Sequence, residues 1–298
     1  MWKLFNRLKW HVGVQFSQFS LFSHLGTCTL FVLLALFLTP CSAQKISTKI
    51  YTLAVVPQYS PAEIQSDWQP LLTRLKKESG IELQLKFHPS IPHFEAGFLR
   101  GEPDFAFVNP YHAVMAKKAQ AYLPLIRNRE HITGVLLVLK NSSFQNIDDL
   151  KNARIGFPAP NSFAASLLIR AYLSQQQIPF EVEYLKSHSN VYRNLMGGFI
   201  AAAGGVSTTY NDEDPKIRDQ FRILYQTPEA ASHPLIVHPR VPEAIRIAIT
   251  QAFLALENDV EGIRLLKKIR IPQPTKANYA QDYRPLEKLN IEKFVVLD

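Results

Sequence analysis

The chain has 298 residues, with 33 lysines and arginines against 25 aspartates and glutamates, which gives a net charge of +8. Both cysteines, Cys28 and Cys41, precede residue 44, so the rest of the chain has no disulfide, no thiolate metal site and no cysteine nucleophile. The positive charge is not gathered into basic runs interleaved with aromatic residues, which argues against nucleic acid as a partner.

The first 43 residues are typical of a secretory signal peptide. They carry three cations and no acid, and residues 29–38 form an apolar run that is too short to span a bilayer comfortably. Small residues precede a cut after Ala43. Two alternatives stay open: an uncleaved membrane anchor, and a lipoprotein attached at Cys41, which Pro40 fits poorly. The sequence therefore predicts a protein that is exported to the periplasm.

Strand and helix patterns alternate after residue 50. Ser60-Pro61-Ala62-Glu63 has the signature of a capped helix start, and Gly80 suits the end of that helix. Strands are expected at 50–56, 81–87 and 105–108, and a short helix is expected at 94–99. This order predicts a parallel sheet that is covered by helices on both faces.

The stretch from Asp104 to Tyr111 carries the first functional prediction. Residues 105–108 are apolar without alternation, as in a strand that is buried on both faces, and Asn109-Pro110 ends the run. Ligands of open α/β sheets bind just outside the carboxyl ends of strands. Asn109 and Tyr111 are therefore candidate ligand-binding residues, and Tyr59, which follows the first strand, is a third.

A second set of elements echoes the first. Gly198 precedes a short apolar strand at 199–203, much as Gly101 precedes the strand near 105, and Gly204-Gly205 is expected to follow that strand. We therefore predict an α/β fold of two similar Rossmann-like lobes with a ligand cleft between them. The expected segments are 44–140 for the first part of lobe one, including a strand at 135–139, then 141–233 for lobe two, and 234–298 for the return to lobe one.

Several blocks, taken in order, resemble the PhnD-like substrate-binding proteins of phosphate/phosphite/phosphonate ABC transporters. The blocks are Val55-Val56-Pro57, then Trp68, Pro70, Leu71 and Leu75, then residues 101–111, 140–142 and 147–151, and Ser187-His188. The resemblance implies a periplasmic-binding-protein fold of type II, whose lobes close on a ligand. It also implies a periplasmic solute-binding protein that delivers a small anion to an ABC transporter. We expect a monomer that needs no cofactor.

The resemblance also implies site residues. The family carries a run of hydroxyl residues at the start of a lobe-two helix, and the matching positions are Ser162, Phe163 and Ala164, so one hydroxyl remains. Backbone N–H groups at a helix start still favour an anion. His188 matches the histidine of the family's serine-histidine pair, and His131 lies near the family's tyrosine before the crossover strand.

The family's acid falls at Ala201, so the carboxylate that would hold a ligand amine is missing. This departure leaves open a different anion, a larger ligand with an apolar tail, or a sensory module that works with a signalling partner. A secreted enzyme is a third hypothesis, but the chain has no G-x-S-x-G, P-loop or G-x-G-x-x-G motif. The seven histidines after residue 44 show no metal-ligand spacing, so we expect neither catalytic nor metal-binding residues. Helix capping by Ser162 and core packing by Phe163 stay open as plainer roles.

Overall fold

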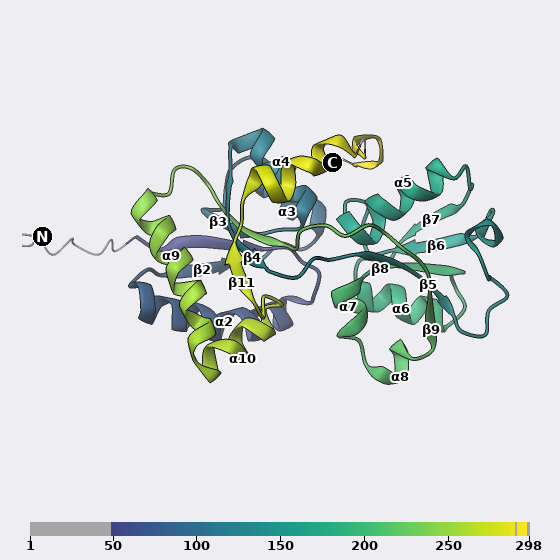
Figure 1. Cartoon of the computed structure of the whole chain (residues 1–298), viewed down its shortest axis with the longest axis horizontal. Helices are drawn as coiled ribbons and strands as arrows, with labels where there is room; N and C mark the ends of the chain where they lie inside the picture. The colour runs from purple at the N-terminus through teal and green to yellow at the C-terminus, as the bar shows by residue number, and fades with distance from the viewer. Residues whose placement is uncertain (1–48, 290, 297–298) are drawn as a thin grey trace, which may run out of the picture. The chain divides into compact units, whose positions relative to one another are not determined.

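The computed structural model describes residues 49–289 and 291–296, all within one unit of the chain, residues 46–298. The expected leader, residues 1–43, and the lipoprotein alternative at Cys41 lie outside the described residues. Among the described helices, none is both long and apolar enough to cross a membrane. Two mixed β-sheets, each flanked by helices, make up the described chain (Figure 1).

The first sheet has six strands in the order β11–β4–β10–β3–β1–β2. Strand β1 pairs in parallel with β2 and β3, whereas β10 is antiparallel to both β3 and β4. Its strands are β1 (Tyr51–Val55), β2 (Leu83–Lys86), β3 (Phe105–Phe107), β4 (Leu123–Asn128), β10 (Pro234–Val237) and β11 (Pro274–Lys276). Lobe one is this sheet with α2 (Pro61–Ser79), α3 (Ile91–Leu99), α4 (Pro110–Gln120), α9 (Glu243–Ala255), η4 (Leu256–Asn258) and α10 (Val260–Lys268).

Helix α2 begins and ends where the sequence predicts. The Ser60 hydroxyl accepts the Glu63 N–H at 3.3 Å, the Glu63 carboxylate accepts the Ser60 N–H at 2.9 Å, and Gly80 follows the helix at a φ of 70°. Helices α9 and α10 both pack on α2, so the C-terminal helices return to lobe one as expected.

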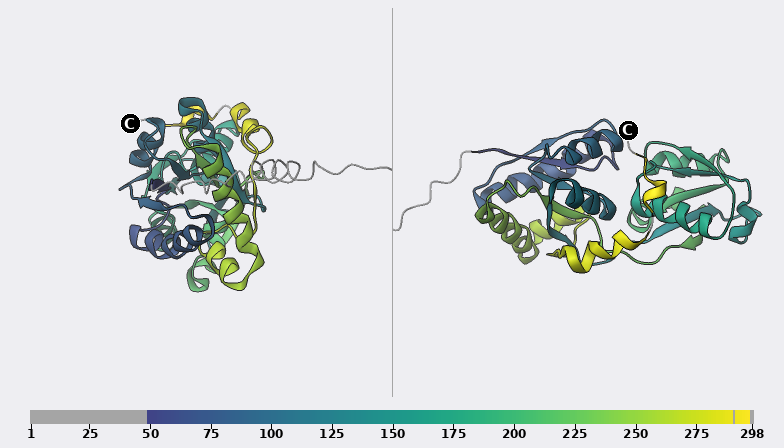
Figure 2. Two further views of the ribbon diagram at one scale, coloured as in Figure 1. Left: turned by 90° about the vertical axis from the view of Figure 1, so that its left-hand side faces the viewer. Right: turned by 90° about the horizontal axis from the view of Figure 1, so that it is seen from above.

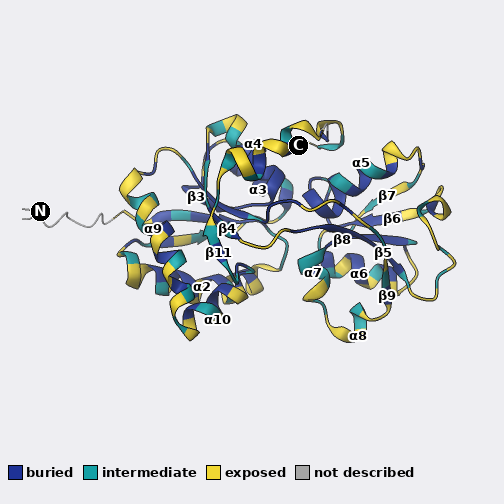
Figure 3. Cartoon of the chain, in the orientation of Figure 1, coloured by how far each residue is buried: buried dark blue, intermediate teal, exposed yellow. Residues whose placement is uncertain are grey.

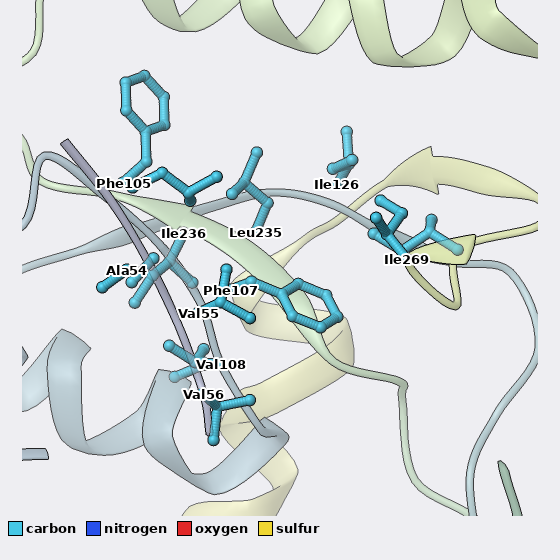
Figure 4. Close-up of a cluster of buried hydrophobic side chains, with 14 of the residues drawn as sticks. Ala54, Val55, Val56, Phe105, Phe107, Val108, Ile126, Leu235, Ile236 and Ile269 are labelled. Carbon is cyan, nitrogen blue, oxygen red and sulfur yellow. The ribbon is translucent and has the colours of Figure 1, made fainter. Parts of the chain in front are cut away.

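Strand β3 lies at the centre of the lobe-one core. Phe105, Ala106 and Val108 are fully buried, which confirms the strand expected from their continuous apolar run. Figure 4 shows the side chains of Phe105 and Val108 among those of the neighbouring strands, including Val55 of β1 and Ile236 of β10. The burial fixes the end of β3, and with it the positions of Asn109 and Tyr111.

Asp104, immediately before β3, ties the strand to β1 and to the segment after β10. Its carboxylate accepts the Thr52 N–H at 3.0 Å and the Thr52 hydroxyl at 3.2 Å, and it lies 2.8 Å from Arg240 Nε. Burial by itself would raise the pKa of Asp104, but the Thr52 bonds and the Arg240 charge outweigh it, so the pKa is lowered. The carboxylate is therefore ionised at neutral pH.

We expect Asp104→Asn to lower the free energy of unfolding by about 2 kcal/mol, because it weakens a partly buried charge pair and its hydrogen bonds. Urea denaturation at neutral pH measures the change. The matched control is Asp148→Asn at an exposed position of lobe two. The difference between Asp104→Asn and the unaltered protein should shrink as the pH falls from 3.8, the ordinary pKa of the group, through the lowered pKa of the folded protein, because the stabilisation that accompanies the lowered pKa is lost over that range. Equal losses in the two variants would contradict this role for Asp104.

The second sheet has five strands in the order β7–β6–β8–β5–β9. Its strands are β5 (Gly134–Leu139), β6 (Arg154–Phe157), β7 (Glu181–Tyr184), β8 (Ala202–Val206) and β9 (Phe221–Gln226). Lobe two is this sheet with η2 (Ile147–Leu150), the π-helical turn η3 (Phe163–Leu167), α5 (Leu168–Gln175), α6 (His188–Met196), α7 (Ser207–Asn211) and α8 (Pro215–Arg218). In both lobes the buried residues gather on the sheets and on the helix faces turned towards them (Figure 3).

The sheet pairing corrects the expected segment boundaries. Strand β5 pairs with β8 and β9, so residues 134–139 belong to lobe two and not to lobe one. The chain leaves lobe one between Asn128 and Gly134, ahead of residue 141, where the predicted segments place the start of lobe two. Strand β4 has no counterpart among the expected strands.

Strand β8 starts at Ala202 and includes Gly204 and Gly205, so the strand expected at 199–203 is shifted along the chain. These glycines do not form a turn. A Cβ at Gly204 would lie 2.1 Å from the Ala165 backbone oxygen, and one at Gly205 would lie 2.6 Å from the Tyr192 hydroxyl. Glycine inside a strand often marks a site where another segment approaches the backbone closely. Here η3 approaches Gly204 and α6 approaches Gly205.

Three segments connect the lobes. The first crossing segment is 129–133 and the second is 227–233, and an isolated bridge between Ile132 and Ala230 joins them. The third is the C-terminal segment, residues 279–296, whose η5 (Tyr279–Tyr283) and η6 (Arg284–Lys288) pack on α4. Its η7 (Glu292–Phe294) reaches lobe two, where the Phe294 backbone oxygen accepts a hydrogen bond from Arg170 at 2.8 Å (Figure 2).

Candidate ligand-binding site

A cavity of about 50 Å³ lies among the loop after β1, both crossing segments and α7. At roughly 10–15 Å³ for each water-sized probe, it has room for a few waters or for a ligand of a few heavy atoms. Its walls come from both lobes. The polar and aromatic lining includes Gln58, Tyr59, Asp67, Trp68, Glu130, His131, Thr208, His233 and Arg270.

Arg270 forms the charged wall of the cavity. Its guanidinium lies 3.9 Å from the centroid of the Tyr59 ring and donates to Asp67 at 2.6 Å. Its Nε is 3.5 Å from a carboxylate oxygen of Asp212, so this ion pair links lobe one to lobe two. Burial raises the pKa of Tyr59 although the Arg270 charge opposes the rise, so the phenol is neutral. The two acids offset the charge of Arg270.

His188, at the start of α6, lies one hydrogen bond from the cavity wall. Its Nδ1 is 3.3 Å from the hydroxyl of Thr209, the neighbour of Thr208. That hydroxyl donates to the Val206 backbone oxygen at 3.0 Å, so we assign the proton of the His188 ring to Nδ1. Nε2 is buried and has no partner among the described residues. Burial lowers the pKa of His188 to about 4, so the ring is neutral at pH 7.

His233, in the second crossing segment, brings another neutral histidine to the cavity. Its Nε2 lies 3.2 Å from Nε2 of Gln58, which can only donate, so the histidine nitrogen accepts. Burial, together with the nearby His112 and His188, lowers the pKa of His233 to about 3. The fold therefore brings His112, His188 and His233, from distant parts of the chain, close together.

A second group of predicted residues meets where α4 faces η3, which we call the interlobe junction. The rings of Tyr111 and Phe163 stack at 6.4 Å with an interplanar angle of 8°. Asn109 caps α4 by accepting the His112 N–H at 2.7 Å. Ser162 precedes η3 without a capping hydrogen bond. Ala164, like the others, is buried.

The predicted site residues thus fall into two neighbouring places. Tyr59 and His131 line the cavity, and His188 lies beside it through Thr209. The other predicted residues pack against one another at the interlobe junction; they are Asn109, Tyr111, Ser162, Phe163 and Ala164. Burial and the Glu292 carboxylate raise the pKa of Tyr111 to about 12, so its hydroxyl keeps its proton.

Three residues of the junction, Glu95, His112 and Asn161, are not among those predicted from the sequence. Glu95 is 3% exposed, with Oε1 2.7 Å from His112 Nε2 and Oε2 accepting from Asn161 Nδ2 at 2.7 Å. The sequence carries one signal for Glu95, because it lies between Phe94 and Phe98 on a mostly apolar helix and a buried carboxylate requires partners. Within the described residues, no group of three or more histidines and acids is arranged to hold a metal ion.

One family model and several solved structures match the chain. The family model described as ABC transporter, phosphonate, periplasmic substrate-binding protein matches residues 53–283. The structure of PhnD1 from Prochlorococcus marinus in complex with methylphosphonate is 17% identical, with a TM-score of 0.73 over 81% of this chain and 97% of that chain. A binding protein component of an ABC phosphonate transporter from Pseudomonas aeruginosa is 14% identical, with a TM-score of 0.72 over 82% and 86%.

A Xanthomonas citri protein bound to chloride ion is 16% identical, with a TM-score of 0.69 over 82% of this chain and 98% of that chain. No curated protein matches the sequence. At such identities the solved structures show the fold alone, and that fold is the type II periplasmic-binding-protein fold expected from the sequence.

Proposed function

Because the chain belongs to the family of periplasmic substrate-binding proteins of phosphonate ABC transporters, we propose that it captures a small phosphonate-like or phosphate-like oxyanion between its lobes. It then presents this ligand to a membrane permease, as a monomer in the periplasm. The family match supports transport and gives no support to the sensory alternative. Family members bind substrates and do not convert them, and we propose no catalytic activity for this chain.

The unpartnered Nε2 of His188 is the observation that carries the proposed ligand class. A buried nitrogen without a hydrogen bond costs free energy, and an oxygen of the ligand would remove that cost. A neutral Nε2 accepts a hydrogen bond from the P–OH group of a monoanion, or it takes up a proton and then donates a hydrogen bond to a dianion. One proton therefore enters the site with each oxyanion.

The dimensions of the cavity support a small ligand over one with a long apolar tail. Its volume of about 50 Å³ suits a few heavy atoms, and a larger ligand would require the lobes to separate. Closure of two lobes on a solute is a known mode of domain motion around ligands. The missing acid at Ala201 and the missing hydroxyls at Phe163 and Ala164 favour a phosphonate without an amino group.

We expect His188→Ala to weaken methylphosphonate binding by about tenfold or more, because the variant loses a charge-assisted hydrogen bond. Titration calorimetry and the fluorescence of Trp68, which lines the cavity and is the one tryptophan after residue 10, both report binding. The matched control is His93→Ala, at an exposed position in α3.

Methylphosphonate, phosphite and phosphate are tested in parallel on the unaltered protein. If none of them binds at millimolar concentration, the proposed ligand class is wrong. If His188→Ala binds as tightly as the unaltered protein, the role of His188 is wrong while the ligand class stands.

A further inference from the structure

Asn161, in the loop before η3, directs its side chain wholly to segments outside lobe two. Its Nδ2 donates to Glu95 Oε2 and to the Val296 backbone oxygen, both at 2.7 Å, and its Oδ1 accepts the Val296 N–H at 2.9 Å. Its backbone oxygen accepts from Asn109 Nδ2 at 3.1 Å. The residue is 1% exposed, so water does not compete for these bonds.

The partners of Asn161 come from three separate parts of the chain: α3, the start of α4 and the end of the C-terminal segment. A second contact also joins lobe two to the C-terminal segment. Arg170 of α5 donates to the Phe294 backbone oxygen at 2.8 Å, and its guanidinium lies 5.6 Å from the centroid of the Phe294 ring. The loop before η3 is therefore the point at which lobe one, lobe two and the C-terminal segment are held together.

We propose that Asn161 is a positioning residue that couples the approach of the two lobes to the ligand site. It holds the start of η3 against α3, α4 and the C-terminal segment, and so keeps together the two lobes that both line the cavity. The inference rests on the proposed function. Separation of the lobes would break the bonds to Glu95 and Asn109 together, so their formation is cooperative.

The chemistry of the asparagine amide fits this role. One face of the amide pairs with both the N–H and the carbonyl of Val296, while the second N–H of the same group reaches Glu95. An aspartate has no N–H for either acceptor and would place a second carboxylate opposite Glu95. An alanine would leave the Glu95 carboxylate with one partner fewer in a buried position.

The apparent affinity of a protein for its ligand falls in proportion to the populated fraction of its binding-competent state. Loss of the Asn161 bonds lowers the fraction of molecules whose lobes are in contact. We expect Asn161→Ala to reduce the affinity for methylphosphonate by about tenfold, because fewer molecules have their lobes in contact. The effect is indirect, since Asn161 does not line the cavity.

The direct test measures the distance between the lobes without ligand. Spin labels are placed at Lys216→Cys on α8 and Lys268→Cys at the end of α10, both exposed, in the chain with Cys28→Ser and Cys41→Ser. Pulsed electron paramagnetic resonance should show a longer and broader distance distribution in Asn161→Ala. The control is Asn190→Ala, whose amide bonds the Leu185 backbone oxygen within lobe two, and it should not change the distribution.

A pair of variants separates coupling from a general structural role. Asn161→Asp alone should open the lobes at least as far as Asn161→Ala, because two buried carboxylates then face each other. Adding Glu95→Gln restores the hydrogen bond between residues 161 and 95 with donor and acceptor exchanged. The double variant should therefore have a shorter distance between the lobes and a higher affinity than Asn161→Asp alone. A general loss of stability would not be repaired by a second substitution at Glu95.

An unchanged distance distribution in Asn161→Ala overturns the inference. If that variant does not fold, Asn161→Asp takes its place, because it also loses the donor to Glu95 and Val296, and an unchanged distribution there overturns the inference equally. The distances are measured without ligand. If methylphosphonate, phosphite and phosphate all fail to bind, the proposed ligand class is wrong. The measured distances still decide whether Asn161 couples the two lobes.

Discussion

Gly204→Ala is expected to destabilise the protein by about 3 kcal/mol, near the upper end of the usual cost of overpacking. The new Cβ would lie 2.1 Å from the Ala165 backbone oxygen and 2.5 Å from the Phe157 ring. A backbone oxygen cannot turn aside as a side chain can, so η3 must shift. Because η3 begins at the interlobe junction, the same substitution should also weaken methylphosphonate binding.

Gly134→Ala should act in the same way, since its Cβ would meet the Ala164 backbone oxygen at 2.2 Å. The control is Gly197→Ala, where the Cβ would lie 2.7 Å from the ring of Phe199, a side chain that is 69% exposed and free to move. Urea denaturation and titration calorimetry measure the two effects. A Gly204→Ala protein as stable as Gly197→Ala would show that η3 does not depend on this close approach.

Acidification from neutral pH to about pH 4 is expected to lower the free energy of unfolding by roughly 3 kcal/mol through His188 alone. Burial lowers its pKa from the ordinary 6.5 to about 4, so the folded protein keeps the ring neutral while the unfolded chain takes up a proton. This contribution to stability is complete above pH 6.5 and is lost as the pH falls towards 4. His233, whose pKa burial lowers to about 3, acts in the same direction.

The test is a series of urea denaturations across this pH range. One titrating group gives a slope of about 1.4 kcal/mol per pH unit, so His188→Gln should reduce the slope by up to that amount between pH 4 and 6.5. His93→Gln, at an exposed position, should leave the slope unchanged. If His188→Gln and the unaltered protein have the same pH dependence, His188 is not held neutral by burial. A bound oxyanion should reduce the loss of unfolding free energy at low pH, because it stabilises the protonated ring of His188.

Local signals in the sequence were sufficient for much of lobe one. The capping box of Ser60 and Glu63 and the glycine at position 80 act within a few residues of one another, and α2 has the predicted ends. The continuous apolar run at 105–108 also marked a buried strand, because burial on both faces removes the alternation. Such features depend little on the rest of the fold.

The predictions that are wrong concern residues whose structure depends on contacts with distant segments of the chain. Gly204 and Gly205 are expected to follow a strand, but they lie inside β8, where η3 and α6 approach too closely to leave room for a Cβ. The prediction for residues 135–139 assigns the wrong lobe, because the apolar sequence of β5 suits either sheet equally. Nothing local distinguishes Asn161 from an ordinary loop asparagine, since its side-chain partners are Glu95 and Val296.

The wide turn η3 has a consequence for the helix that follows it. The Ser162 backbone oxygen accepts the N–H of Ser166 at 2.8 Å and also that of Leu167 at 3.1 Å, so this turn holds one residue more than an α-helical turn. Each residue advances an α-helix by about 100°. Deleting one residue from 163–167 would therefore leave the composition of the helix almost intact and yet rotate Ile169 and Leu173 out of the lobe-two core. All five residues of η3 are buried, and the length of this turn sets which face of α5 meets the lobe-two core.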